Sequence, residues 1–381
     1  MDRFTLSANT LAKTVKNIRA DRIEIEIGDS KQLDFKPQFK IKRWDNEVNF
    51  SMRAVEEAGA AMVEEDDKVK YKGKDIEVHQ YEKPEAGEDG GFEFEWVLNK
   101  KPKSNVLRAT IQHKGLDFFY QPALTAEEIK QGASRSENVV GSYAVYHKTN
   151  KNNAVGGMEY KTGKAFHIYR PYAVDADGVQ VWCELDITEG ELTVTVPEDF
   201  LNKASYPVVV DPTFGYTSGG ASFVVTNNGS ADSSIYGNLN DSVSGSLNSV
   251  HTYVASDDVG TATFNFVFGD GGATRAGVTN IIDSNLGANV TGESPSWKTY
   301  TASNKSFTAT SRVGITAYFE YQGTNHLRSY YDTGSNTDSF FITGDSNSYI
   351  LTTTVLNSIY ATYTEAAPSF NPAFAHRRLL L

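Results

Sequence analysis

Apolar and polar residues alternate with a period of two along much of the chain. Ile23, Ile25 and Ile27 are separated by single glutamates, and phenylalanines repeat the pattern over residues 264–268. Successive side chains of a β-strand point to opposite faces, so this alternation predicts strands with one apolar face. Short strands that recur between Asn-Gly and Asp-Gly turns are typical of sandwiches and jelly rolls. We therefore expect an all-β protein.

Two hairpins and two helices are more specific expectations. Residues 91–98 and 105–113 are alternating runs on either side of a Lys-Lys-Pro-Lys segment, which predicts a hairpin, and residues 69–81 predict a second one around a Lys-Gly-Lys turn. Residues 4–20 place apolar side chains three to four positions apart, which predicts a short N-terminal helix. The Ala-rich and then acidic residues 54–67 are the second helix candidate.

The density of charged residues falls sharply near residue 213. Residues 1–213 contain 29 Lys and Arg and 36 Asp and Glu, whereas residues 214–365 contain 5 and 12. Gly, Ser, Thr and Asn supply 75 of the 152 residues of that second segment. Two prolines bracket the transition, and proline is tolerated at strand ends rather than in mid-sheet. We therefore predict two β-sandwich or jelly-roll domains, a charged one over residues 1–213 and a jelly-roll-like one over residues 214–365, followed by an extended C-terminal arm over residues 366–381.

Charge, hydropathy and cysteine content exclude several classes of partner. The net charge of -12, with no long basic run to offset it, disfavours nucleic acid. No segment approaches the roughly 18 apolar residues of a membrane span, and the first 20 residues lack the apolar core of a secretory signal. Cys183 is the single cysteine, so no intrachain disulfide is expected. Its alternating apolar neighbours favour a buried side chain over a nucleophile.

Motifs that would indicate catalysis are missing from the sequence. There is no Gly-x-Ser-x-Gly elbow, no phosphate-binding loop, and no two of the seven histidines lie at a zinc-ligand spacing. We therefore expect no enzymatic activity, no catalytic residues and no catalytic cofactor. Abundant Asp and Glu leave a glycoside hydrolase open as a third reading, although no pair of carboxylates stands out.

A short acidic segment is the best candidate for a metal. Asp175 and Asp177 precede Gly178 and could give oxygen ligands to a structural calcium ion, but no glutamate follows at the EF-hand position. Asp and Gly are also the residues that tight turns prefer. The turn is the favoured reading, and calcium is the one cofactor left open.

Aromatic residues in the Gly-, Ser- and Thr-rich segment are the best candidates for ligand binding. They lie in polar, loop-like surroundings, where a ring could stack on the C–H face of a sugar: Trp297, Tyr300, Tyr330 and Tyr331. The alternative is that these rings belong to the core or to an interface, as aromatic residues of a β-sandwich usually do.

The C-terminal arm combines two prolines, apolar anchors and positive charge. Its candidate contact residues are Phe370, Phe374, Arg377, Arg378 and Leu381. Docking the apolar side chains on a neighbouring subunit would recover about 1.5–3 kcal/mol for each large one that is buried. The two arginines would be attracted to the acidic surface of another copy. The arm therefore predicts a homo-oligomer, with a frayed end as the alternative.

Several segments resemble a family of uncharacterised, β-rich proteins from phage and environmental genomes. The resemblance rests on Lys-Ala-Phe-His-Ile-Tyr-Arg-Pro at 164–171, Tyr-Pro-Val-Val-Val-Asp-Pro-Thr-Phe-Gly-Tyr-Thr at 206–217 and Arg-Trp-Asp-Asn-Glu at 43–47, and it covers most of residues 22–217. The 206–213 segment is also similar to the junction before DNRLRE-type β-domains of bacterial surface proteins. The resemblance implies a virion-like protein and supplies no catalytic residues.

These observations together predict a structural component of a bacteriophage virion. It would lie on the particle surface as a head decoration, a head fibre or a tail-associated protein, assembled in the bacterial cytoplasm and released by lysis. Its partners would be other copies of itself and other virion proteins. The alternative is a carbohydrate-binding or adhesin module that recognises a host glycan.

Overall fold

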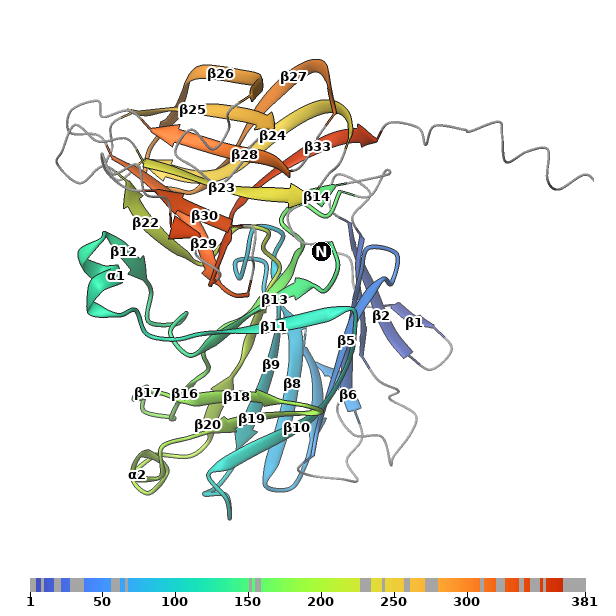
Figure 1. The fold of residues 1–381 in the computed structure, drawn as a ribbon. Helices are drawn as coiled ribbons and strands as arrows, with labels where there is room; N and C mark the ends of the chain where they lie inside the picture. Colours follow the sequence, from blue (N-terminus) through green and yellow to red (C-terminus); the bar gives the residue numbers. More distant parts are fainter. Residues whose placement is uncertain are drawn as a thin grey trace, which may run out of the picture.

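The protein folds almost entirely into antiparallel β-sheets (Figure 1), as the alternating pattern predicts. The computed structural model describes residues 5–7, 10–16, 22–27, 38–55, 62–65, 68–150, 153–154, 159–226, 234–241, 244–256, 261–270, 280–308, 312–319, 326–335, 339–342, 350–351 and 354–365. Within these residues the helices are short, α1 (Ala126–Lys130) and α2 (Glu198–Leu201). None of the described helices is long and apolar enough to cross a membrane.

The first sandwich is built from two sheets. Sheet A has the strand order β1 (Thr5–Ser7), β2 (Thr10–Lys16), β3 (Arg22–Ile27), β4 (Gln38–Arg43), β5 (Val48–Ala54), β10 (Val106–Lys114), β19 (Glu191–Thr195), β18 (Glu184–Thr188). Sheet B has the order β11 (Leu116–Gln121), β13 (Ser142–His147), β15 (Lys164–Ile168), β21 (Thr213–Gly215), β9 (Gly91–Leu98), β20 (Val208–Asp211), β16 (Tyr172–Val174), β17 (Gln180–Trp182), and β8 (Ile76–Glu82), β7 (Lys68–Lys72) and β6 (Met62–Glu65) extend it from β9.

The core of this sandwich lies between sheets A and B. Ile23, Ile25 and Ile27 are fully buried in it, as their alternation predicts. Phe39 of β4 meets the rings of Phe92 and Phe214 from sheet B, with centroids 4.8 and 5.1 Å away. Such aromatic contacts add to the stabilisation from burying apolar area. The core cluster extends along the chain to Tyr216.

Both predicted helices are strands where the structure describes them. Within residues 4–20 the described residues form β1 and β2, because β2 pairs with β3 and so completes the hydrogen bonding of an otherwise open strand. Within residues 54–67, β6 pairs with β7. In both places strand pairing outweighs a weak helical period.

One predicted hairpin is confirmed and the other is wrong. β7 and β8 pair across the turn at 72–74. Residues 91–98 and 105–113 do form strands, β9 and β10, but they belong to different sheets, so the chain crosses the sandwich between them. β9 pairs instead with β8, β20 and β21.

The second sandwich is a jelly roll, as the sequence predicts. Sheet C contains β22 (Ser222–Thr226), β29 (Leu327–Thr333), β24 (Ser244–Ser256) and β27 (Ser296–Thr308) in that order, and sheet D contains β23 (Ser234–Asp241), β28 (Arg312–Phe319), β25 (Thr261–Asp270) and β26 (Asn280–Thr291). Pairing the first, eighth, third and sixth strands in one sheet and the second, seventh, fourth and fifth in the other is jelly-roll winding. The later strands extend both sheets: β30 (Ser339–Ile342), β31 (Ile350–Leu351), β32 (Val355–Asn357) and β33 (Ile359–Glu365).

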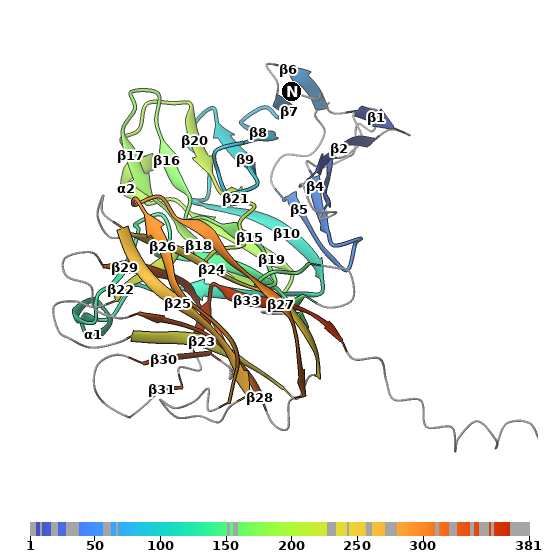
Figure 2. The same cartoon turned by 90° about the horizontal axis from the view of Figure 1, so that it is seen from above.

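The jelly roll is stacked on one end of the first sandwich (Figure 1), and β1 and β2 lie to one side of it in the view along the stacking direction (Figure 2). Two short strands from residues 1–213 belong to sheet C: β12 (Ala133–Arg135) pairs with β22, and β14 (Asn153–Ala154) pairs with β33. The division at residue 213 stays a prediction, since sheet B continues to Gly215 and the first segment contributes strands to the second sandwich.

Candidate functional site

The two sandwiches meet at a junction, to which Arg43, β15 and residues 216–220 contribute buried residues. Lys164 and His167 of β15 are fully buried there. Arg43, at the end of β4, is 2% exposed and donates hydrogen bonds to the backbone carbonyls of Lys164 and Ala165. The chain then runs from β21 through buried residues 216–220 into the jelly roll. Segments far apart in the sequence thus meet at this junction.

An ion pair between Lys164 and Asp332 lies at the centre of the junction. The Lys164 Nζ is 2.7 Å from the Asp332 Oδ2, and both side chains are completely buried. Lys164 also donates to the carbonyl of Gly219 at 2.9 Å. Asp332 accepts hydrogen bonds from the Tyr146 hydroxyl at 2.8 Å and from the backbone N–H of Ala221 at 2.9 Å. Burial alone would raise the pKa of Asp332, but the Lys164 charge, together with the hydrogen bonds from Lys164 and the Ala221 N–H, outweighs burial and lowers that pKa.

His167 is a neutral member of this junction. Its Nε2 lies 2.7 Å from the Ser142 hydroxyl, and its Nδ1 has no hydrogen-bond partner among the described residues. Burial, followed by the nearby Lys164 charge, lowers the pKa of His167 to about 3. The imidazole is therefore uncharged at neutral pH and adds no charge beside the Lys164–Asp332 pair.

A second set of contacts clamps the connecting segment. The Oε2 of Glu88, from the loop before β9, accepts hydrogen bonds from the backbone N–H groups of Ser218 and Gly219 and from the Thr217 hydroxyl. Its Oε1 accepts from the indole Nε1 of Trp297 in the jelly roll at 2.7 Å. One carboxylate thus contacts the first sandwich's exit segment and the second sandwich together.

Further hydrogen bonds join the edges of the two sandwiches. Gln121 of β11 donates from Nε2 to the carbonyl of Thr333 at 2.8 Å and accepts the Thr333 backbone N–H at 2.9 Å. Arg135 of β12 donates to the hydroxyls of Ser222 and Thr333 at 2.8 and 2.7 Å. The junction is therefore closed by side chains as well as by the shared strands β12 and β14.

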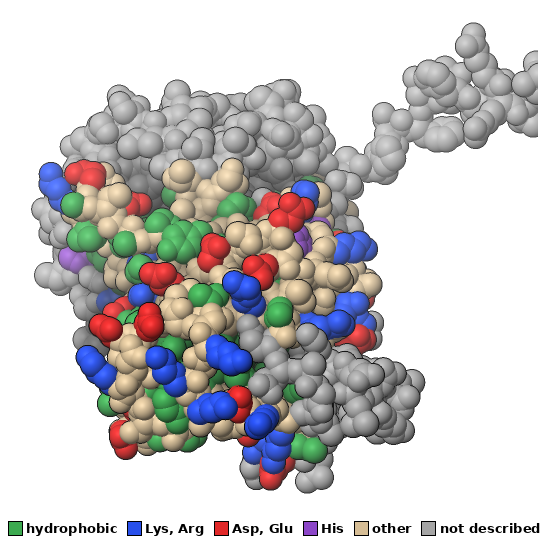
Figure 3. Space-filling view, turned by 90° about the horizontal axis from the view of Figure 1, so that it is seen from below, with side chains coloured by type: hydrophobic (Ala, Val, Ile, Leu, Met, Phe, Trp, Pro, Cys, Tyr) green, Lys and Arg blue, Asp and Glu red, His purple; other side chains and the backbone are tan. Residues whose placement is uncertain are grey.

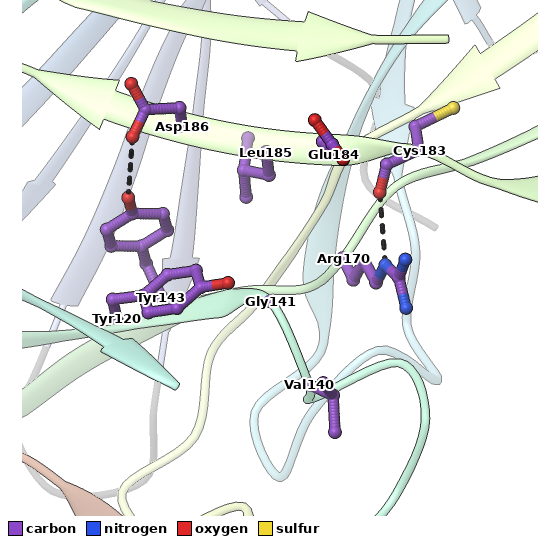
Figure 4. Close-up of a pocket in the computed structure, with 9 residues that line it drawn as sticks. All are labelled: Tyr120, Val140, Gly141, Tyr143, Arg170, Cys183, Glu184, Leu185 and Asp186. Carbon is purple, nitrogen blue, oxygen red and sulfur yellow. Dashed lines mark hydrogen bonds between the residues drawn. The ribbon is translucent and has the colours of Figure 1, made fainter. Parts of the chain in front are cut away.

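An open pocket lies apart from the junction, at an edge of the first sandwich (Figure 4). It has a volume of about 410 Å³ and opens between β18 of sheet A and β11 and β13 of sheet B. Tyr120 and Tyr143 form one side, with ring centroids 5.4 Å apart in an edge-to-face contact. Tyr120 is 49% exposed. We call this the Tyr120 pocket.

Charged groups of both signs line the Tyr120 pocket. Glu184 and Asp186, two residues apart on β18, are exposed. The Tyr143 hydroxyl donates to Asp186 Oδ1 at 3.3 Å and accepts the Ile187 N–H at 3.2 Å. Arg170 donates from Nε to the Cys183 carbonyl at 3.1 Å (Figure 4), which orients its guanidinium at the pocket wall. Burial raises the pKa of the neighbouring Cys183 thiol to about 12, so that thiol is not a nucleophile at neutral pH.

The outward face of sheet B carries a buried acidic pair. Glu93 is fully buried and Asp211 is nearly so, and Lys83 Nζ lies 2.5 Å from Glu93 and 3.9 Å from Asp211. Burial, then the charge of Glu93, raises the pKa of Asp211 to about 8, and burial raises the pKa of Glu93 as well. One lysine thus neutralises a site that holds two carboxyl groups, and the second carboxyl is held protonated at neutral pH.

The four predicted aromatic residues do not share one exposed surface. Trp297 is half-buried at the junction, where its ring meets Tyr253 and Tyr360 with centroids 5.2 and 5.1 Å away. Tyr330 and Tyr331 are buried on successive positions of β29, and Tyr300 is half-buried in β27. Glycan binding at these four residues stays a prediction.

The acidic segment forms the expected turn. Asp175 Oδ1 accepts the backbone N–H groups of Asp177 and Val179 at 3.0 and 2.9 Å, and its Oδ2 accepts that of Ser205 at 3.1 Å. Gly178 takes the positive φ of 83° that the turn requires. No cluster of three potential metal ligands occurs among the residues that the structure describes. Calcium at Asp175 and Asp177 stays a prediction, and the arm residues 366–381 lie outside the described residues.

Sequence patterns did not reveal the residues of the junction or of the Tyr120 pocket. Lys164 begins one of the resembling segments, but Asp332 lies in a Tyr-Tyr-Asp-Thr stretch that reads as a strand end followed by a turn. Glu184 and Asp186 alternate with apolar residues, as in any surface strand. Arg43, Lys164, His167 and Arg170 lie in segments that the sequence singled out, but for the resemblance and not as site residues.

No protein-family model and no curated protein matches this chain.

Proposed function

We propose that this protein is a structural component of a bacteriophage virion, exposed on the particle surface as a head decoration, a head fibre or a tail-associated protein. The observation that carries the proposal is the jelly roll, which is joined to the other sandwich by a buried ion pair and by two short strands, β12 and β14, that pair with its sheet C. Jelly rolls are common in viral capsid proteins and in lectins, and this analogy of fold supports the proposal without assigning a site.

The construction of the junction suits a part that must keep its shape outside a cell. A buried ion pair with extra hydrogen bonds favours one arrangement of its partners, since any other leaves a charge without a partner in a dry environment. Strands β12 and β14 add backbone pairing across the same boundary. Domains that move relative to each other are usually joined by smaller and more polar contacts.

The surface chemistry agrees with a protein displayed in water. On the face of the first sandwich shown in Figure 3, Lys and Arg side chains are interspersed with Asp and Glu. Mixed charge and a net charge of -12 favour solubility and discourage non-specific association with nucleic acid. The role proposed for the chain is structural, with other virion proteins and further copies of itself as partners.

Purification of particles released by lysis from cells that carry the same genome tests the proposal. Mass spectrometry across a density gradient should find this chain in the particle fractions at a stoichiometry comparable to that of other structural proteins, and an antibody against it should bind intact particles. A host cytoplasmic enzyme serves as the contamination control. Recovery of the chain only in the fractions that contain that enzyme would contradict the proposal.

The arm provides a separate test of assembly. A chain that ends at residue 365 should keep its two sandwiches, measured by near-UV circular dichroism, but lose self-association in light scattering or attachment to particles. If the shortened chain assembles and attaches as the full chain does, the arm has no assembly role, and the virion proposal then rests on the gradient experiment alone.

A further inference from the structure

We propose that the Tyr120 pocket binds a neutral saccharide unit. The proposal goes beyond a structural role, because it assigns a recognition site to the first sandwich, in a different part of the chain from the aromatic residues that the sequence singled out. The volume of the Tyr120 pocket, about 410 Å³, lies within the range of about 300–1,000 Å³ that is typical of small-molecule sites.

The pocket is formed mostly by strands, with one tight turn and the connection between β15 and β16 that carries Arg170, so much of its wall is in place without a ligand. Tyr120, Tyr143 and the β18 residues belong to regular strands. Gly141 closes the remaining side with a φ of 84°, and a Cβ there would lie 3.5 Å from Arg170 and 3.8 Å from the Tyr120 hydroxyl. A larger side chain at this position would project between these two residues. A preformed site binds its ligand with less loss of conformational entropy.

Charge favours a neutral ligand with many hydroxyl groups. Glu184 and Asp186 would repel an anion, and the Arg170 guanidinium would reduce the attraction of the two carboxylates for a cation. A saccharide hydroxyl satisfies both kinds of group, because it can donate to a carboxylate and accept from a guanidinium. Arg170 uses its Nε for the Cys183 carbonyl, which leaves its two terminal nitrogens to donate to a ligand. Hydrogen bonds to charged groups are the stronger ones.

The exposed Tyr120 ring provides the apolar part of the site. About half of its surface is exposed, although the Tyr143 ring holds it from the side. The C–H face of a sugar ring is apolar and covers such a surface, while its hydroxyls reach the charged groups at the rim. A small apolar molecule would use Tyr120 but would form no hydrogen bond with Glu184 or Arg170.

Saturation-transfer NMR and calorimetry on the full chain test the site. The probes are neutral hexoses, N-acetylhexosamines and deoxyhexoses with their disaccharides, compared with a sialic acid, a lysine-rich peptide and phenol. We expect a subset of the neutral saccharides to bind, with Kd values on the order of millimolar for one ring. Tyr120→Ala and Glu184→Gln should each weaken binding by about tenfold or more, roughly the effect of losing one good contact.

Two matched substitutions outside the pocket serve as controls. Glu189→Gln removes another exposed carboxylate, from the turn that follows β18, and Val179→Ala shortens an exposed apolar side chain. Both should leave binding unchanged, and unaltered thermal unfolding of all variants would show that they fold. The proposal is overturned if no neutral saccharide binds, if only the peptide, the sialic acid or phenol does, or if Tyr120→Ala and Glu184→Gln bind as the unmodified chain does. None of these results affects the particle-fractionation test.

Discussion

Removing the buried charge of Lys164 should weaken the protein more than any change at an exposed ion pair. In Lys164→Met the side chain keeps its length and apolar stem, but Asp332 remains completely buried without its cation. Removing one partner of a buried pair costs about 3–5 kcal/mol, because the other charge cannot return to water. The Tyr146 hydroxyl and the Ala221 N–H still donate to Asp332, which places the expected loss near the lower end, about 3 kcal/mol.

The double variant Lys164→Met, Asp332→Leu separates charge from packing. It removes both charges but leaves the Tyr146 hydroxyl and the Ala221 N–H without an acceptor, at about 1–3 kcal/mol for each buried group. Each single variant leaves one buried charge without its partner, whereas the double variant leaves none. The destabilisation of the double variant should therefore be smaller than the sum of the two single destabilisations, with a coupling energy of about 2 kcal/mol or more.

Guanidinium denaturation measures these losses, with tryptophan fluorescence and far-UV circular dichroism followed in parallel. Trp297 lies at the junction and reports on its opening. Lys100→Met is the matched control: Lys100 lies 2.8 Å from Asp75, but the two side chains are 62% and 37% exposed, so the expected loss is below about 1 kcal/mol. Equal losses for Lys164→Met and Lys100→Met, or additive single losses, would refute the reasoning.

Three further predictions follow from other contacts. The pKa of Asp211 is about 8 in the folded chain instead of its ordinary 3.8. Between these two pH values the folded chain holds a proton that the unfolded chain lacks. The free energy of unfolding should therefore fall as pH rises from 5 to 8, by at most about 1.4 kcal/mol per pH unit. Asp211→Asn should flatten that slope in urea denaturation, and an unchanged slope would contradict it. Gly220→Ala should destabilise by at least about 1–3 kcal/mol in the same assay, since a Cβ there would lie 2.3 Å from the Tyr331 backbone. Trp297→Phe keeps an aromatic ring but removes the indole N–H that donates to Glu88. We expect a loss of stability of about 1.5–3 kcal/mol, measured by thermal unfolding. A loss as small as that of Lys100→Met would show that the hydrogen bond contributes little.

Local patterns in the sequence were enough to predict much of the fold. The alternation of Ile23, Ile25 and Ile27 predicts one apolar face, and all three side chains are buried. The Lys-Gly-Lys turn at 72–74 joins paired strands. The density of short strands and turns beyond residue 214 predicts the jelly roll. These features depend on the backbone geometry of a few consecutive residues, which the sequence specifies directly.

Tertiary structure alone decided which strands are partners and which side chains meet. Residues 91–98 and 105–113 read as a hairpin, yet β9 and β10 lie in opposite sheets, because pairing is chosen by which apolar faces can be buried together. Residues 10–16 carry a helical pattern but complete the edge beside β3. Lys164 meets Asp332, and Tyr120 faces β18, only after both sandwiches close. Burial and desolvation arise between distant segments, so no local pattern contains them.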